Sequence, residues 1–187
     1  MLERDIFIVL TDTGTLLTRM IRLYTKLPLN HVSIAFDESL SEVYSFGRKR
    51  PHNPFIGGFV REDFSSCLFR QSLCGVYRCK VSAEDYERMK KRIKQIEEQK
   101  HKYRYNFIGL FGVMFNKEIK REHAFFCSQF VATIMNECEE KLFNCSTYLI
   151  QPQHFMVSER LEMVYAGDLA DYPKMRRGIS QLKLSME

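Results

Sequence analysis

Hydrophobic and polar side chains alternate in several short segments, and this pattern predicts a sheet of antiparallel strands. Residues 5–10 (DIFIVL) form a short apolar run that ends in a turn, as is typical of a buried strand. Residues 31–36 (HVSIAF) alternate between apolar and small or polar side chains, and residues 41–46 (SEVYSF) follow after a turn. These two segments predict a β-hairpin, and residues 75–81 (GVYRCKV) predict a further strand.

Helical segments are expected between and after these strands. They are residues 15–26, 83–99 and 124–140, a short, closely packed helix within residues 103–115, and a short helix that starts near Pro152. Ser82 is a good N-cap for the second of them, because its hydroxyl can accept a hydrogen bond from the first helical turn. Phe126, Phe130 and Ile134 give segment 124–140 the most convincing apolar face, so it is expected to be the core helix.

The remaining segments and the order of the elements predict the fold class. Residues 48–58 are expected to be a loop, because they contain two prolines and two glycines. Residues 59–67 fit no single pattern and stay unassigned. Consecutive antiparallel strands with helices grouped beside them predict an α+β fold rather than a doubly wound α/β sheet.

Length and composition suit a single domain over residues 1–187. The chain has 187 residues, of which 45% are hydrophobic and 27% are charged, so it can bury a core without disulfides or metal. We expect the core to span about residues 5–170 and residues 178–187 to be a frayed tail. The apolar run 6–10 is too short for a signal peptide, which predicts a cytoplasmic protein.

The charge of the chain is moderately positive. Twenty-eight basic residues against 23 acidic ones give a net charge of +5. This excess would support only weak contact with an anionic surface, and solvated helix faces explain it equally well. No nucleic-acid-binding motif accompanies it, and no apolar run approaches the roughly 20 residues of a membrane span, so neither nucleic acid nor a transmembrane segment is expected.

Motif searches leave a cysteine as the best candidate for chemistry. The six cysteines form no CxxC pair, and their use without a secretory signal is typical of a reducing compartment. The chain contains no HxxxH, HExxH, glycine-rich phosphate-binding or GxSxG pattern. We therefore expect no metal, no cofactor and no serine nucleophile.

Cys127 lies at or near the start of the expected core helix, in the segment FFCSQFV. The positive end of a helix dipole and a nearby imidazolium both favour the thiolate, which is the nucleophilic form of cysteine. The unpaired N–H groups of the first turn could bind the oxyanion of a tetrahedral intermediate. The alternative is that Cys127 is another small buried hydrophobe, which is the common fate of free cysteines.

His31 is the best partner for this thiol. It opens an alternating strand, and Ser33 and Ala35 share its face and leave room beside the imidazole. An ordinary histidine at a strand end remains the alternative. A third group should orient the imidazole, and it is expected on the paired strand, where Glu42, Tyr44 and Ser45 are candidates. Glu42 is chemically better, because a carboxylate can hold an imidazolium.

Together these segments resemble the circularly permuted papain-like cysteine hydrolases of the NlpC superfamily, with the bacterial YaeF and YiiX proteins as the nearest branch. In that group the histidine strand precedes the cysteine helix, as it does here. Four segments carry the likeness: residues 5–24, 30–36 (NHVSIAF), 126–132 (FCSQFVA) and 150–158 (IQPQHFMVS). The resemblance implies a permuted papain-like fold, in which an antiparallel sheet packs against the helix that bears the nucleophile.

The resemblance also implies roles for individual residues. Cys127 matches the nucleophile and His31 matches the general base. The third polar position falls at or near Ser45, where relatives often have Glu or His, so serine is a departure from the family pattern. Glu42 could compensate from a neighbouring position.

The expected activity is that of a cysteine-dependent hydrolase or acyltransferase acting on an amide of peptide or cell-wall type, or on an ester. Within the resembled family, lipid-directed thiol acyltransferases and hydrolases are a further alternative, and residues 103–115 would then line an apolar pocket or simply form core. A catalytically weak or inactive binding module on the same fold is the remaining alternative. Selective reactivity of Cys127 toward iodoacetamide separates the enzyme from the binding module.

Overall fold

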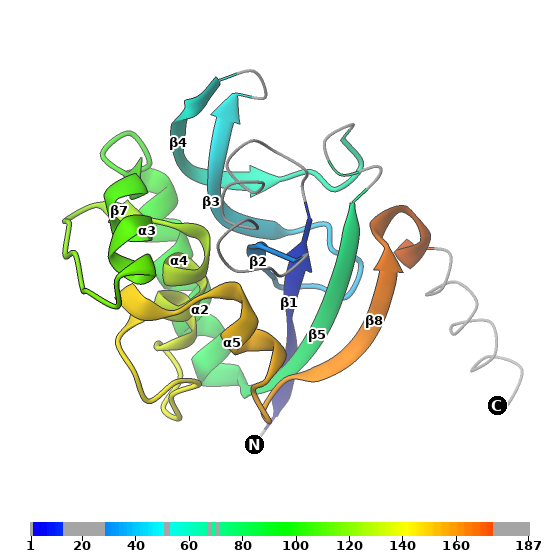
Figure 1. Cartoon of the computed structure of the whole chain (residues 1–187). Helices are drawn as coiled ribbons and strands as arrows, with labels where there is room; N and C mark the ends of the chain where they lie inside the picture. The colour runs from blue at the N-terminus through cyan, green and yellow to red at the C-terminus, as the bar shows by residue number, and fades with distance from the viewer. Residues whose placement is uncertain (1, 13–28, 51–52, 67–68, 70–71, 174–187) are drawn as a thin grey trace, which may run out of the picture.

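A computed structural model describes residues 2–12, 29–50, 53–66, 69 and 72–173 of the chain (Figure 1). Six strands form one sheet in the order β4-β3-β2-β1-β5-β8, and every neighbouring pair is antiparallel. The strands are β1 (Glu3–Thr11), β2 (His31–Ala35), β3 (Val43–Arg50), β4 (Asn53–Glu62), β5 (Leu73–Ser82) and β8 (Glu162–Asp168). The prediction of an α+β fold with an antiparallel sheet is confirmed.

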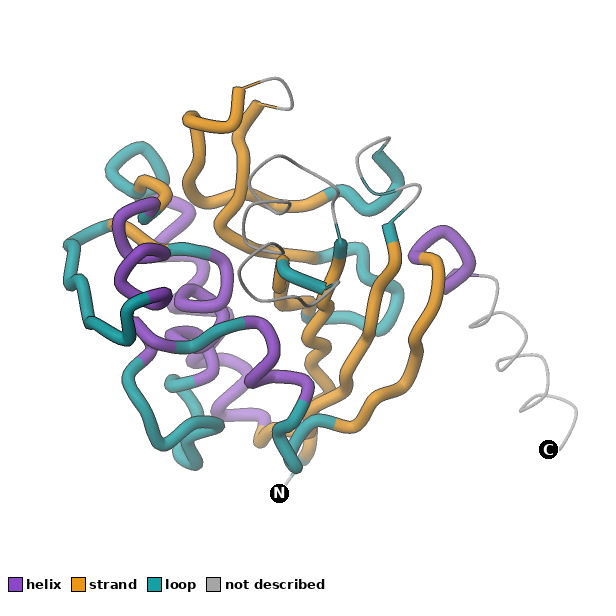
Figure 2. Tube along the Cα trace, viewed as in Figure 1, coloured by secondary structure: helices purple, strands orange, loops and turns teal. Residues whose placement is uncertain are grey.

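The α-helices gather beside one face of this sheet, as Figure 2 shows in purple. They are α2 (Ala83–Glu98), α3 (Phe107–Met114), α4 (Cys127–Met135) and α5 (Pro152–Met156), with 3-10 turns η1 (Thr147–Leu149) and η2 (Leu169–Asp171). Two short strands, β6 (Arg104–Tyr105) and β7 (Ala124–Phe125), pair in parallel and lead into α3 and α4. Ser82 caps α2 by accepting a hydrogen bond from the N–H of Asp85, as predicted.

The alternation along the strands divides the apolar side chains between two clusters. Ile8 and Ile34, which are register partners on β1 and β2, belong to the larger cluster, as does Phe130 of α4. Val9 and Ala35 point to the opposite face and join a smaller cluster. Burying each large side chain stabilises the fold by about 1.5–3 kcal/mol, so the helical face carries most of the hydrophobic stabilisation.

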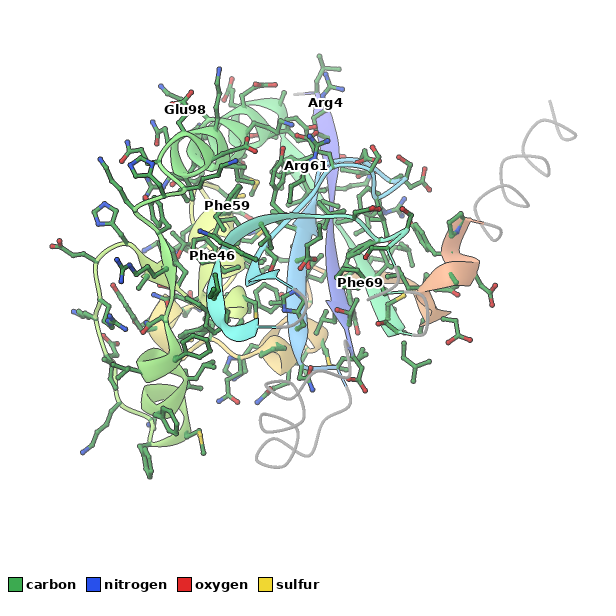
Figure 3. All side chains as sticks on the ribbon, turned by 90° about the horizontal axis from the view of Figure 1, so that it is seen from above. Arg4, Phe46, Phe59, Arg61, Phe69 and Glu98 are labelled. Carbon is green, nitrogen blue, oxygen red and sulfur yellow. The ribbon has the colours of Figure 1, made fainter. Side chains whose placement is uncertain are left out.

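Aromatic rings fill the space between β3, β4 and α4. Phe46 of β3 and Phe59 of β4 lie beside one another in Figure 3, and their ring centroids are 6.0 Å apart in an edge-on contact. Phe130 of α4 contacts both rings, at 5.0 and 5.9 Å. These contacts fix the position of α4 against the β3–β4 hairpin, and the start of α4 carries Cys127.

The predicted elements agree with the structure except in two regions and at the starts of two helical segments, where residues 104–105 and 124–125 form β6 and β7. The strands at residues 5–10 and 75–81, the hairpin and the helix from Pro152 are confirmed, and the core helix is confirmed as the shorter α4. The predicted loop at residues 48–58 is wrong, because β3 and β4 run through most of it. Strand β8 was not anticipated. The predicted helix at residues 15–26 and the tail at 178–187 lie outside the described residues.

Candidate functional site

Cys127 is the first residue of α4. The preceding residue, Phe126, is extended (φ −98°, ψ 167°) and its carbonyl accepts the first helical hydrogen bond, from Phe130 N at 2.9 Å. The apolar face of α4 packs on β2 and β3, and Ser128 anchors the first turn by donating a 2.7 Å hydrogen bond to the Ile150 carbonyl. The sulfur therefore sits at the positive end of a firmly held helix.

His31 is the first residue of β2, at the end of the sheet where α4 begins. Its backbone pairs with Thr11 of β1, and the preceding Asn30 donates a hydrogen bond to the Thr11 carbonyl. The imidazole is a hydrogen-bond partner of the Cys127 thiol. The predicted meeting of Cys127 and His31 is thus present in the structure, although the two residues are far apart in the chain.

Glu62, the last residue of β4, holds the other side of the imidazole. His31 Nε2 lies 2.7 Å from Glu62 Oε1, and the side chains are only 11% and 7% exposed. The Ser33 hydroxyl donates to the second carboxylate oxygen. Because Nε2 faces Glu62, the ring nitrogen left for Cys127 is Nδ1, so the three side chains form a relay in the order Cys127, His31, Glu62.

The charges of this relay support one another. Burial on its own would lower the pKa of His31, but the carboxylate of Glu62 and the hydrogen bond to Cys127 raise that pKa to about 10. Burial would raise the pKa of Cys127, but the hydrogen bond and positive charge of His31 outweigh it. The N–H groups of Val32 and Ser128 lower the Cys127 pKa further. Both shifts favour a thiolate–imidazolium pair over a neutral thiol and imidazole.

All three candidates named for the third position have partners other than the imidazole, and the Tyr44 hydroxyl donates its hydrogen bond to Glu42. The Ser45 hydroxyl donates a 2.8 Å hydrogen bond to the Val32 carbonyl. Glu42 accepts hydrogen bonds from Tyr44 and Lys90 on the α2 side of the sheet. The carboxylate that contacts the imidazole is instead that of Glu62 on β4, one strand further from His31 than β3, where the third group was expected.

Ser45 nevertheless has a local role. The ladder between β2 and β3 pairs Ile34 with Tyr44 and Ala35 with Val43. Beyond these pairs, the Ser45 hydroxyl satisfies the Val32 carbonyl. The Val32 N–H, which points to the same side of the strand, donates a hydrogen bond to Cys127. The pairing of β2 with β3 thus stops short of His31, and Cys127 takes up the free N–H of β2 beyond it.

Tyr105, which the sequence analysis did not single out, also reaches the sulfur. It lies in β6, opposite Phe125 of β7, and its hydroxyl is a hydrogen-bond partner of Cys127. Burial and the negative charge of Cys127 raise the pKa of Tyr105 well above its usual value, so the phenol keeps its proton. The aromatic segment before α3 was the only sequence signal for this contact.

A narrow cavity of about 50 Å³ opens beside Cys127. Its walls are almost entirely apolar side chains of α3, the start of α4 and the segment before α5. The lining residues include Leu110, Val113, Met114, Phe126 and Ile150, with Asn30 and Gln151 also present. Cys127 is only 3% exposed, and it belongs to the lining of this cavity.

The described residues contain neither a cluster of metal ligands nor a membrane-spanning helix. Among residues 2–12, 29–50, 53–66, 69 and 72–173, no group of three or more His, Cys, Asp or Glu side chains could hold a metal ion. In the same part of the chain, no helix is both long enough and apolar enough to cross a bilayer.

Comparisons with models of protein families, with curated proteins and with solved structures give no match to this chain. The assignment of a function therefore rests on the geometry around Cys127.

Proposed function

We propose that this protein is a cysteine-dependent hydrolase or acyltransferase with Cys127 as nucleophile and His31 as general base and acid. The observation that carries the proposal is the relay of Cys127, His31 and Glu62, with its 2.7 Å contact between His31 and Glu62. A buried imidazole held between a carboxylate and a thiol at a helix N-terminus is the arrangement that activates cysteine nucleophiles.

The first half of the reaction forms an acyl-enzyme. The Cys127 thiolate attacks the carbonyl carbon of an amide or ester, a C–S bond forms, and the carbonyl oxygen becomes an oxyanion. His31 then donates its proton to the departing amine or alcohol as the C–N or C–O bond breaks. Glu62 keeps the imidazolium oriented and stabilises its charge throughout this step.

Hydrogen-bond donors for the oxyanion are close to the sulfur. The Cys127 N–H lies in the first turn of α4, where helical N–H groups have no partner within the helix, and in the free protein it donates to the Tyr105 oxygen, which an oxyanion would replace as acceptor. The Tyr105 hydroxyl keeps its proton and reaches the sulfur, so it is a second donor candidate. Fixed donors of this kind stabilise developing charge without reorganisation.

The second half releases the acyl group. His31 removes a proton from water or another acceptor, whose oxygen or nitrogen attacks the thioester carbonyl. The C–S bond breaks, and the proton taken by His31 restores the thiolate–imidazolium pair. Water as acceptor gives hydrolysis, and an amine or alcohol gives acyl transfer.

The element order supports a permuted papain-like fold as part of this proposal. The histidine strand β2 comes first in the chain, the carboxylate strand β4 next, and the cysteine helix α4 last. The helix packs on an antiparallel sheet, as the resemblance to the permuted NlpC-type hydrolases implies. The resemblance expects the third polar residue on the strand after His31, and in this proposal Glu62, one strand further on, takes that role in place of Ser45.

A lipid-directed substrate is the second candidate, and the cavity beside Cys127 favours it. The lining contributed by Leu110, Val113 and Met114 would accept an acyl chain better than a polar peptide side chain. The inactive binding module is less well supported, since its main argument is a missing third residue and Glu62 provides one.

Trapping of the acyl-enzyme tests the proposal. The chain is incubated with p-nitrophenyl acetate, p-nitrophenyl octanoate and a short peptide thioester, and the site of acylation is found by mass spectrometry. We expect acylation at Cys127, loss of acylation in Cys127→Ala, and no change in a Cys138→Ala control, because burial raises the pKa of Cys138 to about 12. A preference for octanoate favours the lipid-directed candidate. Acylation that is equal in Cys127→Ala and the wild type contradicts the proposed function.

A further inference from the structure

The outer face of α3 exposes an unusual amount of apolar surface. Ile108, Phe111, Met114 and Phe115 are between 37% and 71% exposed. Ile108, Phe111 and Phe115 recur at helical spacing, so they share one stripe of the helix and its C-cap. Among large apolar side chains on a folded surface, a contiguous group of this kind marks an interaction site.

The opposite side of the same helix lines the cavity beside Cys127. Leu110 and Val113 face that cavity, while Met114 belongs both to its lining and to the exposed group. In Figure 1, α3 lies at the outer side of the helical layer, on the side of the molecule away from β8. A partner that binds the exposed stripe therefore lies close to the cavity that Cys127 helps to line.

Basic side chains flank the stripe. Residues 100–122 contain six basic and two acidic residues, a net charge of +4, in a chain whose total is +5. The basic residues are Lys100, Lys102, Arg104, Lys117, Lys120 and Arg121. All six side chains are exposed. Lys120 forms an ion pair with Glu118 at 3.8 Å, and this pair also lies at the surface. A net charge of +4 thus borders the apolar stripe.

We propose that α3 and its flanking basic residues dock on an anionic lipid surface. An apolar stripe that enters the interface, bordered by basic groups that meet anionic headgroups, is the physical signature of interfacial membrane binding. The combination favours a lipid surface over a protein partner, because α3 carries only apolar residues and glycine, and the basic side chains lie in the segments on both sides of it. Docking would present the cavity beside Cys127 to the acyl chains of lipids that leave the bilayer.

The docking itself does not depend on the proposed function, but the substrate class it implies does. If Cys127 is the nucleophile, the substrate is an ester or amide that carries an acyl chain and resides in or near an anionic leaflet. Membrane binding is measured without any substrate, so the docking can be refuted without refuting the proposed reaction at Cys127, and the reverse.

Co-sedimentation with vesicles tests the docking. The full chain is mixed with vesicles of phosphatidylcholine alone, or of phosphatidylcholine with about 30% phosphatidylserine, at low and high salt. We expect binding to the anionic vesicles, weakened but not abolished by salt because the apolar stripe contributes. The variant Phe111→Ser with Phe115→Ser should lose about tenfold in partitioning. Its matched control, Val157→Ser with Met163→Ser, changes two comparably exposed apolar residues elsewhere and should bind as the wild type does.

Charge variants complete the test. Lys117→Glu with Arg121→Glu should bind anionic vesicles at least tenfold more weakly, because each basic residue near the surface contributes to attraction. Lys91→Glu with Lys94→Glu places the same charge change on exposed positions of α2 and should have a much smaller effect. Circular dichroism checks that all four variants fold. A wild-type chain that binds neither kind of vesicle overturns the proposal, as does equal loss in the α3 and α2 charge variants.

The outcomes for docking and catalysis can be told apart. A chain that binds vesicles while Cys127 stays unreactive contradicts the proposed function and leaves the docking intact. A chain that is acylated at Cys127 but does not bind to either kind of vesicle contradicts the docking alone.

Discussion

His31 Nε2 and Glu62 Oε1 lie 2.7 Å apart, although 31 positions separate the two residues in the chain. The contact joins the first residue of β2 to the last residue of β4, across the intervening strand β3. It turns a buried histidine, which burial alone would leave neutral, into a cation beside a thiol. The reactivity proposed for Cys127 depends on this contact.

Replacing the carboxylate tests its effect on the imidazole. In Glu62→Gln the pKa of His31 should fall clearly below about 10, because burial lowers it and only Cys127 is left to raise it. Titration of the ring by NMR measures the shift. Glu42→Gln is the matched control and should leave the His31 pKa unchanged, since Glu42 contacts Tyr44 and Lys90 instead. An unaltered His31 pKa in Glu62→Gln would refute the assigned role of Glu62.

The same pair predicts how stability varies with pH. The folded-state pKa of His31, about 10, is above its ordinary value of 6.5, so the stabilisation is complete below pH 6.5 and is lost as pH rises through 10. Relative to Glu62→Gln, the wild type should therefore lose on the order of 1–3 kcal/mol of unfolding free energy between pH 6 and pH 10. Urea unfolding at several pH values measures the difference. Parallel curves for the two proteins would disagree with a charged His31.

Two buried serines separate an electrostatic role from a structural one. Ser33→Ala removes the hydroxyl that holds the second oxygen of Glu62, and Ser45→Ala removes the hydrogen bond to the Val32 carbonyl. Each substitution should lower the free energy of unfolding by about 1 kcal/mol. Only Ser33→Ala should also lower the His31 pKa and slow Cys127 alkylation. A larger effect of Ser45→Ala on the His31 pKa would restore Ser45 as the third residue.

Close packing against Gly57 tests the placement of Tyr105. A Cβ on Gly57 would come 2.7 Å from the Tyr105 Cβ, which cannot move freely, whereas a Cβ on Gly47 would meet its nearest atom at 3.6 Å. Gly57→Ala should therefore destabilise the fold by about 1–3 kcal/mol and displace Tyr105 from Cys127. Gly47→Ala should be tolerated. Thermal unfolding and the alkylation rate of Cys127 measure both effects, and equal behaviour of the two variants would argue against this packing.

Local patterns were sufficient for the parts of the site that lie on clear elements. The alternation around His31 predicted β2, and the apolar face after Cys127 predicted α4. Their meeting was an inference from the resemblance, because no periodicity links residues so far apart. The charge on the imidazole was not predictable, since it depends on the buried partner.

Glu62 was missed because local composition and tertiary packing disagree over residues 48–58. Prolines and glycines there predicted a loop, but Gly57 and Gly58 lie within β4, where β6 approaches too closely for a Cβ. Because residues 48–58 were predicted to be a loop and residues 59–67 stayed unassigned, the sequence did not place Glu62 on either face of the sheet. The alternation of Val60 and Glu62 with Phe59 and Arg61 was the signal that could have revealed it.

The most direct test of the central claim is the rate of Cys127 alkylation by iodoacetamide as a function of pH, with the exposed Cys145 as internal reference. Because His31 lowers the Cys127 pKa, Cys127 should react about tenfold faster than Cys145 near pH 6, and His31→Ala should remove the excess. The buried Cys74 and Cys138, whose pKa burial raises to about 12, should stay unreacted. Alkylation of Cys127 no faster than that of Cys145 near pH 6, or unchanged in His31→Ala, would contradict the thiolate–imidazolium pair.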